Sequence, residues 1–229
     1  MKQYLKDKNF RAGLIITGLM LCVILVGLLW TPYDPNAMSG SEKLQGPSAA
    51  HLFGTDNFGR DIFSRVIQGA GATFLIAAAA VAIGLLIGLV LGGLTGYYGG
   101  VLDEVLMRFS DTILAFPSIL LALVMIAILG KGKYNIIIAL GILFLHIMPN
   151  IIPVLLSSVA IGFNNAVLSE ASMSYLGVGV QPPDPSLGRL LSEAQGYLFQ
   201  APWYALFTGI AIILLILGFG LLSEGMGGE

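Results

Sequence analysis

The sequence predicts an all-α protein that crosses a membrane six times. The 229 residues are 56% hydrophobic and only 10% charged, whereas a soluble domain carries roughly 25% charged residues. The apolar residues gather in runs long enough to span a bilayer, which takes about 20 residues in a helix. The 30 glycines also fit this class, because glycine is frequent where membrane helices touch.

Composition also excludes several functions. The net charge of −2 leaves no basic face for a nucleic acid. The single cysteine, Cys22, lies inside the first apolar run, so no intramolecular disulfide can form. The sequence contains no cluster of Cys and His with metal-ligand spacing and no Walker-type glycine loop. We therefore expect no catalytic residue, no cofactor and no metal in this chain.

Residues 1–30 are predicted to be a cytoplasmic N-terminus and a first transmembrane anchor helix. Four basic residues within residues 1–11 precede the apolar run 12–30, and a basic flank tends to stay in the cytoplasm. A cleaved signal peptide is the alternative. The length of the run, and its ending in Leu-Leu-Trp-Thr-Pro-Tyr without a small-x-small pattern, favour a retained anchor.

Residues 31–70 are predicted to be an external loop that contains a short amphipathic helix along the membrane surface. Asp61 can cap such a helix, and the apolar residues of 62–67 share one face. Two interpretations stay open. The helix packs on its own bundle, or it forms a lip over a substrate pathway.

Residues 71–229 are predicted to be the core, with five further spans. These spans are expected at 71–94, 113–130, 135–147, 151–168 and 206–222. A second external segment covers 169–203, and both termini are cytoplasmic. Gly84, Gly88 and Gly92 share a helix face in the second span, which indicates either a subunit contact or packing within the chain.

The stretch 134–169 contains no Asp, Glu, Lys or Arg. It is too long for one span and too short for two spans with a loop. Pro149 and Pro153 lie four residues apart near its middle, and proline breaks a helix. The pattern predicts two membrane segments that meet with almost nothing between them.

Several long motifs in this order resemble one family. They are Gly54-Thr-Asp-Asn-Phe-Gly-Arg-Asp-Ile-Phe-Ser-Arg65, Gly96-Tyr-Tyr-Gly-Gly100 followed by Asp103, Met107-Arg108 and Asp111, Ala115-Phe-Pro117, His146-Ile-Met-Pro-Asn150, and Ser174-Tyr-Leu-Gly-Val-Gly-Val-Gln-Pro-Pro-Asp-Pro-Ser186. The chain is similar over almost its whole length to the dipeptide, oligopeptide and nickel permeases of bacterial ABC importers. It resembles the second permease of the pair.

This resemblance implies a type I importer permease fold in the bacterial cytoplasmic membrane, within the lipid bilayer. It implies a homologous permease partner, an external substrate-binding protein and two cytoplasmic ATPase subunits that bind ATP and Mg. The expected external gate and docking residues are Gly54, Thr55, Asp56, Gly59, Arg60, Asp61, Gly177, Gly179, Gln181, Pro182 and Pro183. Asp103, Arg108 and Asp111 are expected to brace the bundle on the cytoplasmic side.

One departure from the family concerns the cytoplasmic coupling loop. In the family, the fourth span leads into a long loop that carries a Glu-Ala-Ala helix and ends near the motif found here at His146, Pro149 and Asn150. In this chain the fourth span runs straight into that motif, so the loop is missing near 144–147. Either the segment was omitted from this sequence, which we favour, or the protein lacks it.

The resemblance implies import of di- or oligopeptides by alternating access, with a nickel or metal-chelate importer as the alternative. An ATP-independent channel or secondary transporter is a second hypothesis, for which His146 would be the candidate ionisable group within a long apolar run. A membrane-embedded enzyme is a third, and it would need clustered His or acids at one membrane depth.

Overall fold

The computed structural model describes residues 7–114, 120, 124, 127–128 and 152–227. Within these ranges the regular elements are helices, apart from one isolated antiparallel bridge between Thr55 and Asp61. The helices are α1 (Lys8–Leu29), α2 (Ile62–Tyr98), α3 (Gly100–Leu114), α6 (Ile152–Tyr175), α7 (Leu187–Gln195) and α8 (Pro202–Gly227). The all-α prediction is confirmed for the described part of the chain.

Three of the described helices are long and apolar enough to cross a membrane. They are α1, α2 and the Pro202–Gly225 part of α8, and they correspond to the predicted first, second and sixth spans. The predicted fifth span lies within α6 except for its first residue. Most of the third span, all of the fourth, and the motif residues His146, Pro149 and Asn150 lie outside the described residues. The count of six spans stays a prediction.

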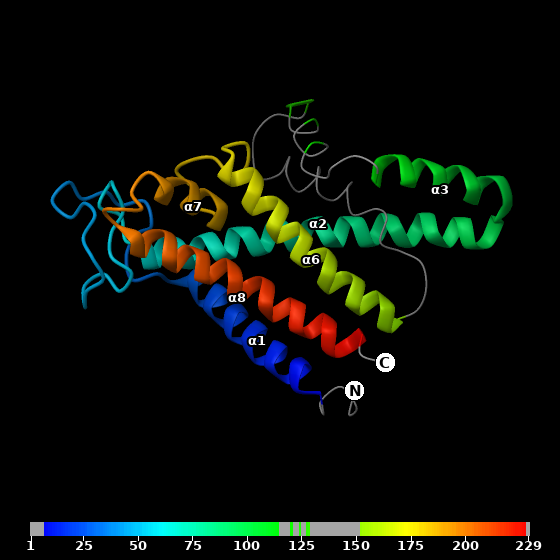
Figure 1. The fold of residues 1–229 in the computed structure, drawn as a ribbon, viewed down its shortest axis with the longest axis horizontal. Helices are drawn as coiled ribbons and strands as arrows, with labels where there is room; N and C mark the ends of the chain where they lie inside the picture. The colour runs from blue at the N-terminus through cyan, green and yellow to red at the C-terminus, as the bar shows by residue number, and fades with distance from the viewer. Residues whose placement is uncertain (1–6, 115–119, 121–123, 125–126, 129–151, 228–229) are drawn as a thin grey trace.

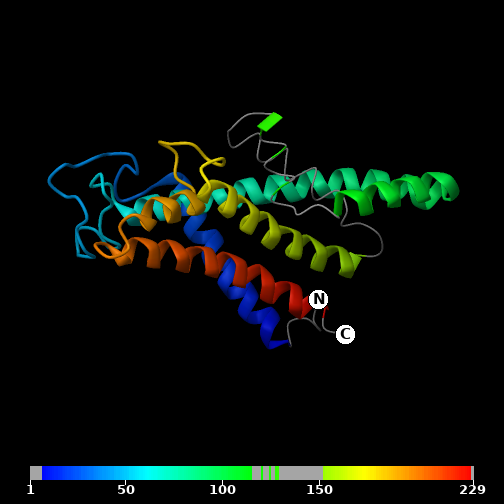
Figure 2. The same cartoon turned by 45° about the horizontal axis from the view of Figure 1, so that its top comes forward.

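Helices α1 and α8 pack antiparallel, and both chain ends lie at the same end of the bundle (Figures 1 and 2). Glycines bring the two backbones close together. A Cβ on Gly13 would lie 2.6 Å from the backbone nitrogen of Leu222, and one on Gly218 would lie 2.6 Å from Oγ1 of Thr17. Small residues permit this close approach, through which membrane helices gain van der Waals contact.

A matched pair of glycine substitutions tests the α1–α8 contact. Gly13→Ala places a methyl group against α8, whereas Gly18→Ala places one where nothing lies within 4 Å. Both changes raise helix propensity equally, so the difference in stability between the two variants reports packing. We expect Gly13→Ala to be less stable than Gly18→Ala by about 2 kcal/mol, which is a typical cost of overpacking. Thermal unfolding in detergent measures the difference, and equal Tm values would contradict the close contact.

Helix α2 corrects one prediction. The sequence predicted a separate amphipathic helix on the membrane surface before the second span. The structure instead has one continuous helix of 37 residues, which is about 55 Å long and well beyond the roughly 30 Å of a hydrocarbon core. Ile62 and Val66 are buried in the common core rather than laid on a membrane. The predicted apolar face exists, and it packs on the bundle, as the first of the two interpretations expected.

The second external segment is also more helical than predicted. Helix α6 continues past the expected end of the fifth span to Tyr175, and α7 occupies Leu187–Gln195. Only residues 176–186 between them lack regular helix, where the glycines and prolines are concentrated. Gly69 of α2 permits the approach of this region, because a Cβ there would lie 3.2 Å from the carbonyl carbon of Ser186.

Helices α2, α6 and α8 share an aromatic contact in the core. Phe163 stacks on Phe219 with ring centroids 3.9 Å apart, and Phe74 lies 5.3 Å from Phe163. Helix α3 lies beside the C-terminal half of α2 (Figure 1). The long α2 thus joins the packed bundle at one end to α3 at the other.

Candidate functional site

The loop cap is the candidate site. We define it as residues 31–61, the loop 176–186, helix α7 and the turn 196–201. It lies at the end of the bundle opposite the two chain ends (Figure 1). Both segments that the sequence predicted to be external meet in it, and Trp203 of α8 lies against the first of them, 2.7 Å from where a Cβ on Gly54 would be.

The motif 54–61 folds into a tight turn that starts α2. Asp56 Oδ1 accepts the backbone N–H groups of Phe58 and Arg60 at 2.8 and 3.0 Å. Gly54 and Gly59 have φ of +76° and +75°, a region that favours glycine because it has no Cβ. Asp61 then caps α2 by accepting the N–H of Ser64 at 2.8 Å. Glycine and aspartate are therefore required here by backbone geometry.

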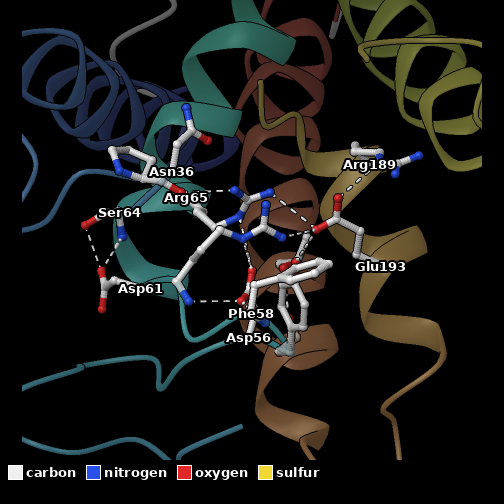
Figure 3. A network of polar contacts seen from close by, with 12 residues as sticks. Asn36, Asp56, Phe58, Asp61, Ser64, Arg65, Arg189 and Glu193 are labelled. Carbon is white, nitrogen blue, oxygen red and sulfur yellow. Dashed lines mark hydrogen bonds and ion pairs between the residues drawn. The ribbon is translucent and has the colours of Figure 1, made fainter. Parts of the chain in front are cut away.

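A buried charged network ties this turn to α7 and α8 (Figure 3). Arg60 Nε donates to Asp56 Oδ2 at 2.6 Å, and its Nη2 donates to Glu193 Oε2 at 3.0 Å. Arg65 Nη2 donates to the same Glu193 oxygen at 3.3 Å and its Nη1 to the carbonyl of Pro35 at 3.0 Å. Charge-assisted bonds of this kind are the strongest in proteins, so the network fixes how the loop sits on the helices.

Two further groups complete the network at Glu193. Arg189 Nε donates to Glu193 Oε1 at 3.1 Å from one turn away on α7, and the Tyr204 hydroxyl of α8 donates to Oε2 at 3.1 Å. One carboxylate thus receives bonds from α2, α7, α8 and the turn before α2. Its position makes Glu193 the hub of the loop cap.

A second hub is Glu170 on α6, which is fully buried. It accepts hydroxyl groups from Thr73 at 2.8 Å and Ser174 at 2.6 Å, and Ser186 also bonds to it. Each of these hydroxyl oxygens accepts a backbone N–H in turn, from Leu187, Val180 and Arg189. The carboxyl therefore holds the loop 176–186 and the start of α7 against α2 and α6.

Burial gives Glu170 an unusual acidity. It lies beyond Leu168, the predicted end of the fifth span, and burial raises its pKa above the ordinary value despite the opposing hydrogen bonds. A raised carboxyl pKa means that the folded state holds the proton to higher pH than the unfolded state. The resulting stability is present in full at acidic pH and declines as the pH rises through the folded-state pKa.

The direction of this pH dependence predicts how a Glu170→Gln variant behaves. Glutamine cannot ionise, so the stability of the variant does not decline with rising pH as that of the parent does. We expect the Tm difference to move in favour of the variant between about pH 4 and about pH 7. A Glu170→Leu variant, which leaves three buried hydroxyls without their acceptor, should lose about 2 kcal/mol at either pH. A pH-independent difference between glutamine and parent would contradict the raised pKa.

The structure gathers the predicted gate and docking residues in the loop cap, but most are inside it. Gly54, Thr55, Asp56, Gly59, Arg60, Asp61 and Gly179 are buried, Gly177 and Gln181 are half-buried, and Pro182 and Pro183 are exposed. The buried members build the loop cap and do not themselves face outward. The surface of the loop cap carries the exposed apolar side chains of Phe58 and Phe199 together with exposed polar residues such as Lys43.

The predicted bracing residues lie on α3. Asp103 is exposed. Arg108 pairs with Glu104 at 2.8 Å, and the two side chains are 77% and 64% exposed. An exposed pair of this kind contributes little to stability. The side chain of Asp111 lies outside the described ones, and the bracing role stays a prediction.

Sequence reasoning did not single out Glu193, Arg65, Glu170 or Tyr204 as individual site residues. A signal existed for the first two. Arg189 and Glu193 stand four apart, as helical ion pairs do, and Arg65 follows the capping Asp61 by one turn. Among the described residues, no group of three or more His, Cys, Asp and Glu is arranged to hold a metal ion. The described polar groups of the loop cap serve to position loops and helices.

Comparison with known proteins decides the family. The profile described as "Binding-protein-dependent transport system inner membrane component" matches residues 84–145 and 139–226. The chain belongs to this family. It is thus a permease, a non-catalytic, multi-pass component of the inner membrane, and it works in a system with ATPase and binding-protein partners. The predicted permease role is confirmed, and the described all-α architecture agrees with it.

Individual permeases align with almost the whole chain. The dipeptide transport system permease protein DppC of Alkalihalophilus pseudofirmus is 35% identical, over 98% of this chain and 86% of its own length. The glutathione transport system permease protein GsiD of Pectobacterium atrosepticum is 32% identical, over 93% and 84%. The probable D,D-dipeptide transport system permease protein DdpC of Escherichia coli is 31% identical, over 93% and 83%.

These alignments are longer than the permease described here. The one with DppC runs over 261 residues, while 98% of 229 residues is about 224, so about 37 positions are filled only in the relative. The two segments matched by the family profile meet at residues 139–145. The relatives therefore carry positions that have no counterpart in this chain.

Proposed function

We propose that this permease imports peptides of two or a few residues, as the second of two homologous permeases in an ATP-driven importer. The observation that carries the proposal is the similarity over nearly the whole chain to permeases named for dipeptides and glutathione. Glutathione is itself a small peptide, so these names share one substrate class. Nickel or a metal chelate is the alternative cargo.

The membrane arrangement in this proposal has six spans and both termini in the cytoplasm. The two chain ends lie at one end of the bundle (Figure 2), and the basic flank within residues 1–11 favours the cytoplasmic side for that end. The loop cap then lies outside, where a substrate-binding protein can dock. Labelling of Lys2 from outside sealed cells would contradict this orientation.

The driving force comes from other subunits. Two ATPase subunits bind ATP and Mg²⁺ and close on the cytoplasmic side, and this favours one of two packings of the paired permeases. The contribution of this chain is positional. Its buried charged network keeps the loop cap rigid, so that movement of the helices is transmitted to the docking surface.

The missing sequence affects this coupling. The profile matches that meet at residues 139–145 and the extra positions in the relative support a gap at 144–147, where the family resemblance places the cytoplasmic coupling loop. We place the gap in this chain between the fourth and fifth spans. A permease without that loop lacks the usual contact with the ATPases.

Reconstitution tests the proposed function. The chain would be expressed with its partner permease, its ATPases and its binding protein in vesicles, and uptake of a labelled dipeptide, glutathione and a nickel complex would be compared. ATP-dependent uptake of a peptide that requires the binding protein is the expected result once the gap at 144–147 is filled. Uptake of nickel alone would favour the alternative cargo. Uptake by the purified chain without ATPases would contradict the proposal.

A further inference from the structure

The exposed faces of two spanning helices are uniformly apolar. On α8 the exposed large side chains of the span are Leu206, Ile210, Ile213 and Leu217, and on α1 they include Ile15 and Leu19, which are 70% and 62% exposed. Side chains of this kind are as apolar as lipid tails. Both faces are therefore suited to contact with the hydrocarbon of the bilayer.

The exposed face of α6 has a different composition. Ile161, Leu168 and Leu176 on this face are about half exposed, but Asn165 is exposed between them and Ser172 is half-buried beside them. These positions, spaced by three or four residues, share one side of a helix. We call Ser158, Ile161, Asn165, Leu168, Ser169, Ser172 and Leu176 the α6 polar face.

Asn165 lies inside the predicted fifth span, 151–168, which makes its exposure significant. It precedes Leu168, the expected outer end of that span, by three residues, and three residues of helix rise about 4.5 Å. Its side chain is therefore within the outer part of the hydrocarbon core. An amide side chain exposed to lipid at that depth costs several kcal/mol, on the order of 4, unless it is hydrogen-bonded. Water or a polar partner is the environment that fits.

Polar groups continue from this face into the loop cap. The Tyr175 hydroxyl donates to Gln195 Oε1 of α7 at 2.8 Å, and this bond is exposed. Gln181 Nε2 donates to the carbonyls of Gly179 and Gly177 at 2.9 and 3.3 Å. The described part of α6 has one charged side chain, Glu170, and it is fully buried on another side of the helix. The polar groups of the α6 polar face are therefore neutral hydrogen-bonding groups, whereas the neighbouring loop 176–186 also exposes the charged Asp184.

We infer that the α6 polar face lines the water-filled passage for substrate, with Tyr175 and Gln195 at its outer mouth. The inference rests on the proposed function and deepens it. Neutral amides and hydroxyls bond to the backbone of a peptide without selecting its side-chain charge. A passage lined in this way suits cargo whose common feature is the peptide group, while the binding protein chooses among side chains.

Cysteine labelling tests the passage directly. Cys22→Ser removes the one native cysteine, and Asn165→Cys and Ser172→Cys then probe the α6 polar face. Ile213→Cys on α8 and Leu19→Cys on α1, which are 61% and 62% exposed in the parent, are matched controls on apolar faces. The complete complex in membrane vesicles is treated with a charged, membrane-impermeant thiol reagent, and labelling rates are compared.

The expected result is labelling of the two α6 cysteines at least about tenfold faster than the controls, because a thiol in an apolar setting has a raised pKa and little reactive thiolate. A lipophilic maleimide should label the controls. If the impermeant reagent labels the α6 positions no faster than the controls, lipid or another helix covers this face and the inference is overturned.

Protection by cargo separates this inference from the proposed function. A dipeptide supplied with its binding protein should slow the labelling of Asn165→Cys but not of Leu19→Cys. If the α6 cysteines label quickly and only a nickel complex protects them, the passage stands and the peptide assignment fails. If peptide uptake is measured but the α6 cysteines stay unlabelled, the function stands and the passage lies elsewhere.

Discussion

Replacing Asp56 with asparagine is expected to lower the free energy of unfolding by about 3 kcal/mol, which is typical of breaking a buried ion pair. Asparagine keeps an oxygen for the backbone N–H groups but loses the negative charge. Arg60 and Arg65 are only 4% and 1% exposed, so water cannot replace the lost partner. Glu193 would then be the one carboxylate left in the network for three guanidinium groups.

A lower Tm and faster proteolysis of the loop cap would report this loss in the purified complex. Glu104→Gln is the control, because it breaks an ion pair whose members are 77% and 64% exposed and should change stability by less than about 1 kcal/mol. Adding Arg60→Met to Asp56→Asn removes one stranded charge and should restore part of the stability. If the double variant loses as much stability as the two single variants together, the side chains of Asp56 and Arg60 are not coupled.

The sequence predicted the elements of this region better than their connections. Asp61 was correctly expected to start a helix, since its carboxylate can accept the free N–H groups of a first turn. The same pattern did not show that this helix runs on into the second span. The prediction ended the external loop at residue 70 and began the second span at residue 71. In the structure the helix continues through this boundary, where Gly69 permits the close approach of the start of α7.

The buried charged network could not be predicted from local sequence patterns, because it joins residues that are far apart in the sequence. Arg60 and Glu193 are 133 residues apart in sequence, and no spacing rule relates residues so distant. Glu170 could have been noticed, because it is the first charged residue after the uncharged stretch 134–169 and an acid in such a place needs partners. Those partners, Thr73 and Ser186, come from two other segments that only the fold brings together.

Function was predictable because the motifs are contiguous in sequence. The motif at 54–61 was expected to form part of the external gate and docking surface, and that role stays a prediction. The structure places its charged side chains inside the loop cap. Such residues are needed for a backbone turn with two positive φ angles and for the network that holds it. A sequence motif that is needed for a backbone turn therefore identifies the family as well as a motif that is needed to bind another protein.

Filling the gap at 144–147 is expected to have the largest effect on activity. ATP can shift the permease between two packings only through contacts that differ between them, and the missing loop is the expected contact with the ATPases. We expect vesicles with the present chain to show ATPase activity that the loaded binding protein does not stimulate. Insertion of the corresponding stretch of the DppC relative should raise stimulated uptake by about 5- to 150-fold, the usual range for a coupling energy.

The control for this experiment is a Gly/Ser linker of the same length at the same place. The linker restores the spacing of the chain but supplies no helix to bind an ATPase, so it should leave uptake uncoupled. If both insertions raise ATP-driven uptake, the present chain is limited by its length between the two spans and not by a missing contact with the ATPases. Full ATP-driven uptake by the chain without any insertion would show that this permease reaches its ATPases by another surface, and α3, with its exposed Asp103, Glu104 and Arg108, would be the first place to seek it by alanine substitution.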